Sequence, residues 1–563
     1  MKLNNIWGYG QLFGFSALDG TNRYYNDFVG TLTQKKIGVR FELKEWIRVF
    51  FPIKGRVKFN AITGDMIDGK TQAGEFFMSF IDNDTLVGIS PVLPQITYKA
   101  KTYNKTFYRG CDCYFNFSDS FVVYVEKFGE LYKFAISHTI NHGIASGIAK
   151  QAINTDLEVL KAKRYAYFKA MPKCKDKRYE RLYYKALAIN KVNVRTAEGK
   201  IPCTWTTPDR VPHRHLWLWD SVFHALAIVN YNPELAKDAI RAVLAQARDD
   251  GFIPCTMSPS GGDDVTQPQV LSWGVWEVYK KTGDKQFLQD SVGVLEGYLT
   301  YDMENRDVNG NGLLEWLGDP DDLTCKCGES GQDNSPRFDF DQDMDAVDFS
   351  MFQVHDAEYL SYIYKELGDE EKAKKWQGVS QNIKDKMNEL LWCENDGVYY
   401  DRLFNGEFSK VLTPVSFFPL FAKVPSREQA EKMVAVLTDE RLLWTKNPIS
   451  TIEKIHPTYS NDMWRGGVWL NLNYFIIKGL QNYGYDELAE DLRVRTLEMV
   501  NKWYKKTGTI FEFYDPEDKT VPYLCHRKGD PINPPDWRKH PHAIVDFNWS
   551  ACFTLMFIQK DLY

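Results

Sequence analysis

Residues 284–306 read DKQFLQDSVGVLEGYLTYDMENR, and this stretch indicates the fold class of most of the chain. Its apolar residues recur every three or four positions, which is the repeat of an α-helix with one buried face. From about residue 155 onward this part of the chain is predicted to be all-α, because similar stretches follow one another. They occupy residues 156–171, 178–192, 233–250, 351–369, 371–393, 426–439, 466–485, 486–506 and 542–559.

The predicted helices come in couples, in which a shorter apolar and aromatic helix precedes a more charged one. Tight turns with Asn-Pro at 232–233 and Gly-Asp at 283–284 and 368–369 alternate with long loops. Such alternation is typical of an inner and an outer layer of helices. Six couples that close on themselves make an (α/α)6 barrel with its long loops at one mouth, and an open helical solenoid is the alternative.

The first 150 residues follow a different pattern of short runs broken by Gly, Asn and Asp. Residues 29–43, 47–64, 84–103 and 118–138 alternate β-branched and aromatic residues with polar ones, which predicts antiparallel strands. We therefore expect a multidomain chain. Its parts are an N-terminal antiparallel β-sandwich over residues 1–150, a helical linker over 151–177 and an all-α (α/α)6 barrel over 178–563.

Composition excludes several classes of protein. At 563 residues the chain exceeds the roughly 250–300 at which a single core stops growing. Its 69 Lys and Arg against 75 Asp and Glu give a net charge of -6, so no nucleic-acid partner is expected. There is no apolar run of membrane-spanning length and no signal-peptide core near the start, which predicts a cytoplasmic protein without a membrane partner.

Ten cysteines are scattered along the chain, with C-x-C pairs at Cys111/Cys113 and Cys325/Cys327. Without zinc-ribbon spacing, reduced thiols are the simplest interpretation, ahead of a disulfide or a metal site. Aromatic residues make up 15% of the chain, which is more than a core needs. Some of them are therefore expected to line a binding site.

The loop before one predicted helix places Trp217 and Trp219 around Asp220. Asp220 has two interpretations. It is either the N-cap of the helix, or a carboxylate that accepts sugar hydroxyls while the neighbouring rings stack on the sugar faces.

A second loop, over residues 315–350, is about 35 residues long and acidic, which is typical of either a functional or a disordered segment. Trp316 is among the aromatic residues expected to anchor it. Asp333 lies between Glu329 and Arg337 in the run ESGQDNSPR. Neighbouring carboxylates raise the pKa of a carboxyl group, as a general acid working near neutral pH requires. Composition alone does not distinguish Asp333 from the other acids of this loop.

The run DVNGNGLLEW at 307–316 shares the start of an EF-hand loop but lacks the Glu at position 12. Oxygen ligands at alternate positions suit Ca²⁺, and an Asn-Gly turn is the alternative. The candidate ligands are Asp307, Asn309, Asn311, Leu313 and Glu315. No organic cofactor is expected.

Two further segments combine aromatic and charged residues. Trp464, Arg465 and Trp469 surround a Gly-Gly pair that allows either a ligand or a helix to come close. In the run TGTIFEFYDPEDK at 507–519, alternation places Glu512 on the face opposite both flanking phenylalanines. Glu512 is either a satisfied polar residue or a base that faces a cavity.

Taken together, these segments resemble glycoside hydrolase family 63, which includes processing α-glucosidases and bacterial mannosylglycerate hydrolases. The resemblance covers the chain from about residue 160 to the C-terminus, in the family's order. Its motifs are WTTPDR at 205–210, LWLWDSVFHA at 216–225, DVNGNGLLEW at 307–316, GESGQDNSPRFD at 328–339, WRGGVWLNLNY at 464–474 and FEFYDP at 511–516.

The resemblance implies a β-sandwich followed by an (α/α)6 catalytic barrel. It also implies that Asp333 is the general acid and Glu512 the general base of an inverting reaction, with the carboxyl groups about 6.5–9.5 Å apart. It supports Ca²⁺ at the 307–315 run. The candidates for holding the sugar are Trp219, Asp220, Gln267, Trp273, Trp316, Arg337, Arg465 and Trp469, although Arg337 could equally brace its loop.

The expected function is that of an exo-acting inverting α-glycosidase, most simply an α-glucosidase, on a disaccharide, short oligosaccharide or glycosylglycerate. The LTCKCG insert at 323–328 departs from the family and is expected to reshape the aglycone side. One alternative is a carbohydrate-binding protein without turnover. Another is an (α/α)6 sugar epimerase, which would use histidines such as His213, His215 and His224. The sequence leaves the sugar, the linkage, the aglycone and the oligomeric state open.

Overall fold

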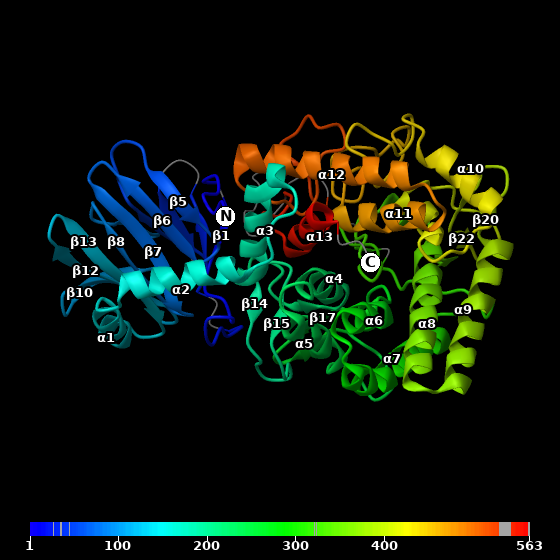
Figure 1. Ribbon diagram of the computed structural model, residues 1–563, viewed down its shortest axis with the longest axis horizontal. Helices are drawn as coiled ribbons and strands as arrows, with labels where there is room; N and C mark the ends of the chain where they lie inside the picture. The colour runs from blue at the N-terminus through cyan, green and yellow to red at the C-terminus, as the bar shows by residue number, and fades with distance from the viewer. Residues whose placement is uncertain are drawn as a thin grey trace.

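The structure is a computed structural model, and it describes residues 1–8, 10–25, 28–33, 37–43, 46–319, 321–322, 324–528 and 542–560. Figure 1 shows two antiparallel sheets at one end of the molecule and a larger helical part at the other. The smaller sheet has the order β1-β2-β3-β4-β9, with β1 Leu12–Phe13, β2 Gly30–Leu32, β3 Gly38–Phe41, β4 Ile47–Phe50 and β9 Gln95–Thr97. The larger sheet has the order β10-β11-β12-β13-β8-β7-β6-β5, with β5 Lys58–Ile62, β6 Met66–Thr71, β7 Gly74–Asp82, β8 Thr85–Ser90, β10 Asn104–Tyr108, β11 Cys111–Phe115, β12 Ser120–Phe128 and β13 Leu131–Thr139.

The two sheets share one apolar core. On β7, Phe76, Met78 and Phe80 belong to the core that also contains Phe41 of the small sheet. Phe77, between them in sequence, belongs instead to the core shared with the helices. Successive side chains on a strand point to opposite faces, so β7 contributes to both cores.

Helices cover the outer face of the larger sheet. Helix α1 (His142–Ala152) contacts β8 and β11–β13, and α2 (Leu157–Ala170) contacts β7. From α2, the buried Arg164 donates to the backbone carbonyl of Phe80 at 2.6 Å. Since α2 packs on this sheet, the segment predicted as a linker is held against the β-rich part. The boundaries at 150 and 177 stay predictions.

The helical part has two layers whose contacts form a ring. Each of α4, α6, α8, η3, α11 and α13 contacts the next, and α13 contacts α4. The other helices contact members of this ring from outside. The bounds are α3 Glu180–Val192, α4 Leu218–Ile228, α5 Pro233–Leu244, α6 Leu271–Thr282, α7 Lys285–Asn305, α8 Val347–Leu367, α9 Glu370–Leu390, η3 Pro414–Leu420, α10 Arg427–Leu437, α11 Leu470–Asn482, α12 Asp486–Thr507 and α13 Asn548–Gln559.

The Gly-Asp turns stop one helix and start the next. Gly283 ends α6 in the left-handed conformation (φ +67°), which glycine adopts without a Cβ clash. The Asp284 side chain then accepts from the Phe287 N–H at the start of α7. Gly368 and Asp369 repeat this arrangement between α8 and α9.

One member of the ring is a 3-10 helix rather than an α-helix. Pro414 begins η3, where a missing N–H is tolerated, and Pro419 lies inside it, where the missing N–H prevents regular α-helical bonding. For the same reason the period of 3.6 does not reveal this segment in the sequence. The observed fold is thus an N-terminal part rich in sheets followed by layered helices.

Short strand pairs join the loops of the helical part. They are β14 Val194–Arg195, β15 Trp205–Thr206, β16 Leu216–Trp217, β17 Thr256–Ser258, β18 Gly261–Gly262, β19 Met344–Asp345, β20 Trp392–Cys393, β21 Val398–Tyr399 and β22 Arg402–Leu403. All ten cysteines are free thiols. Within the part of the chain that the structure describes, the helices are too short or too polar to cross a membrane.

Candidate active site

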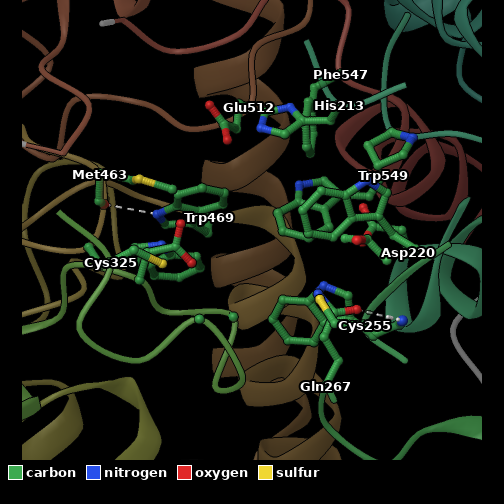
Figure 2. A pocket seen from close by; sticks show the side chains of 18 of the residues that line it. His213, Asp220, Cys255, Gln267, Cys325, Met463, Trp469, Glu512, Phe547 and Trp549 are labelled. Atoms are coloured by element: carbon green, nitrogen blue, oxygen red, sulfur yellow. Dashed lines mark hydrogen bonds between the residues drawn. The ribbon is translucent and has the colours of Figure 1, made fainter. Parts of the chain in front are cut away.

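Loops from distant parts of the sequence surround a cavity of about 300 Å³. Four of the loops singled out in the sequence contribute to it, and Figure 2 shows Asp220 and Trp549 on one side and Cys325 and Met463 on the other. The predicted residues that line it are Asp333, Glu512, Trp219, Asp220, Gln267 and Trp469. The helical ring therefore brings together the two carboxylates that lie 179 positions apart in sequence.

Tryptophans form much of the cavity wall. Trp469 stacks on Trp464 with ring centroids 3.9 Å apart and an interplanar angle of 3°. Trp549 meets both Trp219 and Trp469 edge-on, with centroid distances of 5.5 Å. The Trp469 indole N–H donates to the Met463 carbonyl at 2.9 Å, which fixes its orientation (Figure 2). These rings give the cavity a rigid aromatic surface of the kind on which sugar faces stack.

Asp220 lies in the first turn of α4, but it is not the N-cap. The N-cap position is Trp217, without a side-chain cap bond. Asp220 is buried, and its Oδ1 atom has no hydrogen-bond partner among the described residues. Burial, together with the charges of Glu512 and Asp209, raises the pKa of Asp220 well above its usual value. The carboxyl group is thus poised to bond a polar ligand rather than to cap the helix.

The Gln267 side chain bonds the first turn of α4. Its side-chain oxygen accepts from the Trp219 N–H at 3.2 Å. Since both residues line the cavity, this bond orients the Gln267 amide toward it.

Glu512 lines the cavity, whereas both flanking phenylalanines are buried outside its lining, as the alternation predicted. Its side chain is 3% exposed and pairs with Arg527, whose Nε lies 3.1 Å from Oε2. The Ile544 N–H donates to the same oxygen at 3.2 Å. Phe513 stacks on Trp469 at 5.1 Å. The carboxylate is therefore buried in the cavity wall and held there by two hydrogen-bond donors.

Asp333 is more accessible, with 19% of its side chain exposed. The Lys528 ammonium lies 2.6 Å from its Oδ2. Two residues before it, Gly331 has φ +69°, and a Cβ there would meet the Trp219 ring at 2.5 Å. Only glycine lets the loop lie this close to the ring. The side chain of the next residue, Asn334, accepts from the Trp464 N–H at 3.1 Å.

Four predicted sugar-holding residues are not among the described residues that line the cavity, so their assignment is corrected. Arg337 braces its loop, which was the alternative for it. Its guanidinium pairs with Asp348 at 2.7 Å and with Asp401 at 2.8 Å, and all three are buried. A buried guanidinium needs such paired carboxylates, and here they take four of its five N–H donors.

Arg465 also braces the acidic loop over residues 315–350. It binds Asp339 through both terminal nitrogens, at 2.8 and 2.6 Å. The glycine that follows, Gly466, has φ +139°, and a Cβ there would come within 1.9 Å of the Ser460 carbonyl. This glycine therefore serves a tight turn within its own loop.

The two remaining tryptophans are core residues. Trp273 on α6 packs against Phe421 and Tyr474 inside the helical ring. Trp316 stacks on Phe349 at 3.7 Å, and its indole N–H donates to Asp348 at 2.9 Å. Sequence alone does not distinguish a tryptophan that faces a cavity from one that fills a core.

The 307–315 run lies outside the cavity lining, and side-chain hydrogen bonds close it. The Gly312 N–H donates to Asp307 at 3.0 Å, and the Val308 N–H donates to Glu315 at 2.7 Å. The amides of Asn309 and Asn311 donate to Asp345 at 2.8 and 2.9 Å.

Carboxyl groups crowd together at this run. Burial, followed by the neighbouring Asp345 carboxyl group, raises the pKa of Glu315 to about 8. Asp307 Oδ1 and Glu315 Oε1 are buried without partners among the described residues. Carboxyl and carboxamide oxygens of this kind fit a hard cation. In the present arrangement, no group of three or more His, Cys, Asp and Glu in the described ranges is placed to hold a metal.

The three histidines considered for an epimerase do not converge. His213 lines the cavity and bonds Asp209 at 2.8 Å. His215 bonds Tyr24 at 3.0 Å, and His224 is buried against Thr206. Burial lowers the pKa of His224 to about 3, so it stays neutral. The described residues thus offer no histidine pair for proton shuttling at the cavity.

Sequence reasoning missed several residues of the cavity. Arg527 and Lys528 belong to the run CHRKGD, which has the composition of an ordinary surface loop. Trp549 lies in the first turn of α13, inside a segment that was predicted only as a helix. A charged pair close in sequence to Glu512 was the one available signal, and it is not specific.

The sequence profile of the mannosylglycerate hydrolase MGH1-like glycoside hydrolase domain matches residues 213–550. An uncharacterized protein of Borreliella burgdorferi is 29% identical over 46% of this chain, and the match spans only about half (53%) of that relative's length. The mannosylglycerate hydrolase MGH2 of Selaginella moellendorffii is 25% identical over 55% of this chain and 78% of its own.

Solved structures agree on the fold. The GH63 mannosylglycerate hydrolase of Thermus thermophilus, in complex with glucose, has a TM-score of 0.54 and 22% identity, over 67% of this chain and all of its own. A bacterial glucoamylase complexed with acarbose has a TM-score of 0.62 and 11% identity, over all of this chain and 96% of its own. The second likeness extends to the sheets as well as the helices.

Proposed function

Because the chain belongs to the mannosylglycerate hydrolase MGH1-like glycoside hydrolases of family 63, an inverting family, we propose that it is an exo-acting inverting α-glycosidase. Asp333 is the general acid and Glu512 the general base. The observation that carries the proposal is that these two carboxylates line one aromatic cavity, together with Asp220. We take the contact ring of helices to be the (α/α)6 barrel that holds this cavity at its mouth.

In the proposed reaction, Asp333 gives its proton to the glycosidic oxygen as the bond to the anomeric carbon breaks. Glu512 takes a proton from a water molecule that attacks the same carbon from the opposite face. The Arg527 guanidinium and the Ile544 N–H both donate to the Glu512 carboxylate and orient it for this step. The product sugar therefore leaves with the opposite anomeric configuration.

The size and lining of the cavity suit a single terminal sugar. Trp469 and Trp219 supply flat apolar surfaces, and Asp220 and Gln267 supply hydrogen bonds to hydroxyl groups. A volume of about 300 Å³ accommodates one sugar and a small aglycone, not a polymer. We infer that the substrates are α-linked disaccharides, short oligosaccharides or glycosylglycerates with glucose or mannose at the non-reducing end.

We also propose that Ca²⁺ binds at the 307–315 run and has a structural role. Asp307, Asn309, Asn311, Glu315 and the Leu313 carbonyl would hold it. Asp345 is added to this set, because the side-chain amides of Asn309 and Asn311 converge on its carboxylate. A doubly charged ion would relieve the repulsion between the three carboxyl groups.

Hydrolysis assays test the proposed function. Wild type, D333N and E512Q are incubated with α-linked gluco- and manno-disaccharides and with the two glycosylglycerates. The control is D343N, which alters an exposed carboxylate of the same acidic loop. We expect wild type and D343N to release sugar from at least one substrate, and the other two variants to be inactive. Sugar release by D333N or E512Q at the wild-type rate would show that the assigned pair is wrong.

A further inference from the structure

Two neighbouring cations enter the cavity from one loop, and each meets a different carboxylate. Arg527 pairs with Glu512 at 3.1 Å, and Lys528 pairs with Asp333 at 2.6 Å. Among the described residues that line the cavity, these are the only Lys and Arg side chains. The Arg527 Nε and Nη2 atoms are engaged by Glu512, and Nη2 also lies 3.0 Å from His213 Nε2.

The backbone holds Lys528 in place. Its φ is +63°, a left-handed conformation that a residue with a Cβ adopts only when its surroundings impose it. Its N–H donates to Asp462 at 2.9 Å, and the carbonyl of the nearby His526 accepts from the Met463 N–H at 3.2 Å. The side chain is 25% exposed. Lys528 is thus directed at Asp333 by a fixed loop.

This ion pair occupies one oxygen of the proposed acid. A general acid donates a proton to the leaving group, whereas the ammonium group donates a hydrogen bond to Asp333 Oδ2. While the pair persists, only Oδ1 is free to face the leaving group. Another partner for Lys528 would free both oxygens of Asp333 for the proposed step.

A neutral aglycone offers Lys528 no such partner. The ammonium would remain on Asp333 or would stay unpaired in a largely buried position, and an unpaired buried charge is costly. Burial opposes the charged form of Lys528, but the Asp333 charge outweighs it and raises the pKa of Lys528 above its ordinary value. The side chain is therefore charged beside Asp333, and an anion is the kind of group that best replaces this carboxylate as its partner.

The surroundings place this exchange on the aglycone side. The general acid acts on the glycosidic oxygen, so the leaving group lies next to Asp333. Cys325, from the insert at 323–328, lines the same side, and its thiol bonds Asp333. The charged groups near Lys528 in the described residues are Asp333, Arg527, Asp462 and the more distant Asp322.

We propose that Lys528 determines aglycone specificity: it binds a carboxylate or phosphate on the aglycone and thereby releases Asp333 to act as the acid. This inference rests on the proposed function of Asp333 and Glu512. The enzyme then selects α-glycosides whose leaving group carries an anion close to the glycosidic oxygen. A substrate with a neutral leaving group of the same size reacts poorly because the acid stays paired.

A matched pair of substrates isolates the anion. The α-glycosides of glycerate and of glycerol, each prepared with glucose and with mannose, differ only in a carboxylate against a hydroxymethyl group. The matching α-glycosyl fluorides serve as a third substrate, because fluoride leaves without an organic aglycone and with little need of an acid. The variants are K528M, K528R and the control K519M, which alters a lysine that is 78% exposed.

We expect wild type and K519M to prefer the glycerate by at least tenfold in kcat/KM. K528M should lose about 30-fold on the glycerate, with the two kcat/KM values then within about twofold. K528R should keep most of the preference, since it keeps the charge. Fluoride hydrolysis by K528M should stay within about threefold of wild type, which shows that the variant is folded and that Glu512 works.

Each opposite result has a distinct meaning. Equal rates on glycerate and glycerol in wild type, or an unchanged preference in K528M, would overturn the inference while leaving the proposed function intact. Hydrolysis of the fluoride without cleavage of the glycerate glycoside or the glycerol glycoside would also overturn the inference. If wild type hydrolyses none of the three substrates, including the fluoride, the proposed function fails and the role of Lys528 fails with it.

Discussion

The two walls of the cavity hold their carboxylates in different ways. Glu512 is 3% exposed and is fixed by Arg527 and by the Ile544 N–H, both of which donate to its carboxylate. Asp333 is 19% exposed and pairs with Lys528, whose side chain is itself 25% exposed. A general base begins the reaction ionised and takes up a proton, whereas a general acid begins protonated and gives one up. The difference teaches that the two walls suit the proposed roles differently, since Glu512 has two fixed donors and Asp333 has one partly exposed cation as its partner.

The largest effect is expected from exchanging the carboxylates one at a time. E512Q should lower kcat on a glycoside by about 10²–10⁴-fold, and D333N should do the same. The two should differ on α-glycosyl fluoride, which needs the base but little acid. Fluoride release followed by an ion-selective electrode is expected from D333N and not from E512Q. The reverse pattern would exchange the two roles.

A second prediction concerns the braces behind Asp333. R337M leaves Asp348 and Asp401 buried without a counter-charge, which is expected to cost about 3–5 kcal/mol of the free energy of unfolding. R465M breaks a partly exposed pair with Asp339 and should cost about 1 kcal/mol. Urea unfolding measures both. Equal losses would mean that the loop does not depend on the buried brace.

The wall that carries Asp220 also contains a buried histidine, and it makes stability depend on pH. The pKa of His224 is lowered to about 3 in the fold, against about 6.5 when unfolded. Its stabilising contribution is therefore complete above pH 6.5 and is lost as pH falls, by about 2 kcal/mol at pH 5. H224Q should unfold with a shallower acid slope in urea titrations at pH 5 to 7. An unchanged slope would count against a buried neutral His224.

The smallest effect is expected at the 307–315 run, behind the acidic loop. Calcium chloride at about five times its Kd should stabilise the fold by about 1 kcal/mol, which is roughly 1 °C in Tm for a chain of this length. Calorimetry with EDTA and with added Ca²⁺ measures this difference. D307N should abolish it, and a calcium effect that survives in D307N would place the ion elsewhere.

Much of the cavity could be predicted because its residues interrupt the helical pattern. Asp333 and Glu512 lie in loops and Asp220 lies in the first turn of α4, each among aromatic residues beyond those that a core needs. Their separation along the sequence does not show that they meet in space. The order of the motifs does indicate the fold that brings them together. In the structure all three line one cavity.

The errors have a common physical cause, which is that sequence does not show where a long side chain points. Arg337 and Arg465 lie beside cavity residues, yet their guanidinium groups turn away to buried or half-buried carboxylates. Trp273 lies on a helix of the ring, but its side chain points into the core between the helices. Lys528 was missed because its backbone conformation, not its sequence context, directs it into the cavity.

The most direct test of the inverting acid–base pair is proton NMR of the first sugar released from an α-glycoside. Spectra are recorded within minutes, before mutarotation mixes the anomers, with D333N and E512Q alongside wild type. The account predicts that the β-anomer appears first and that neither variant releases it. Release of the α-anomer first would contradict inversion, and with it the assignment of Glu512 as the base.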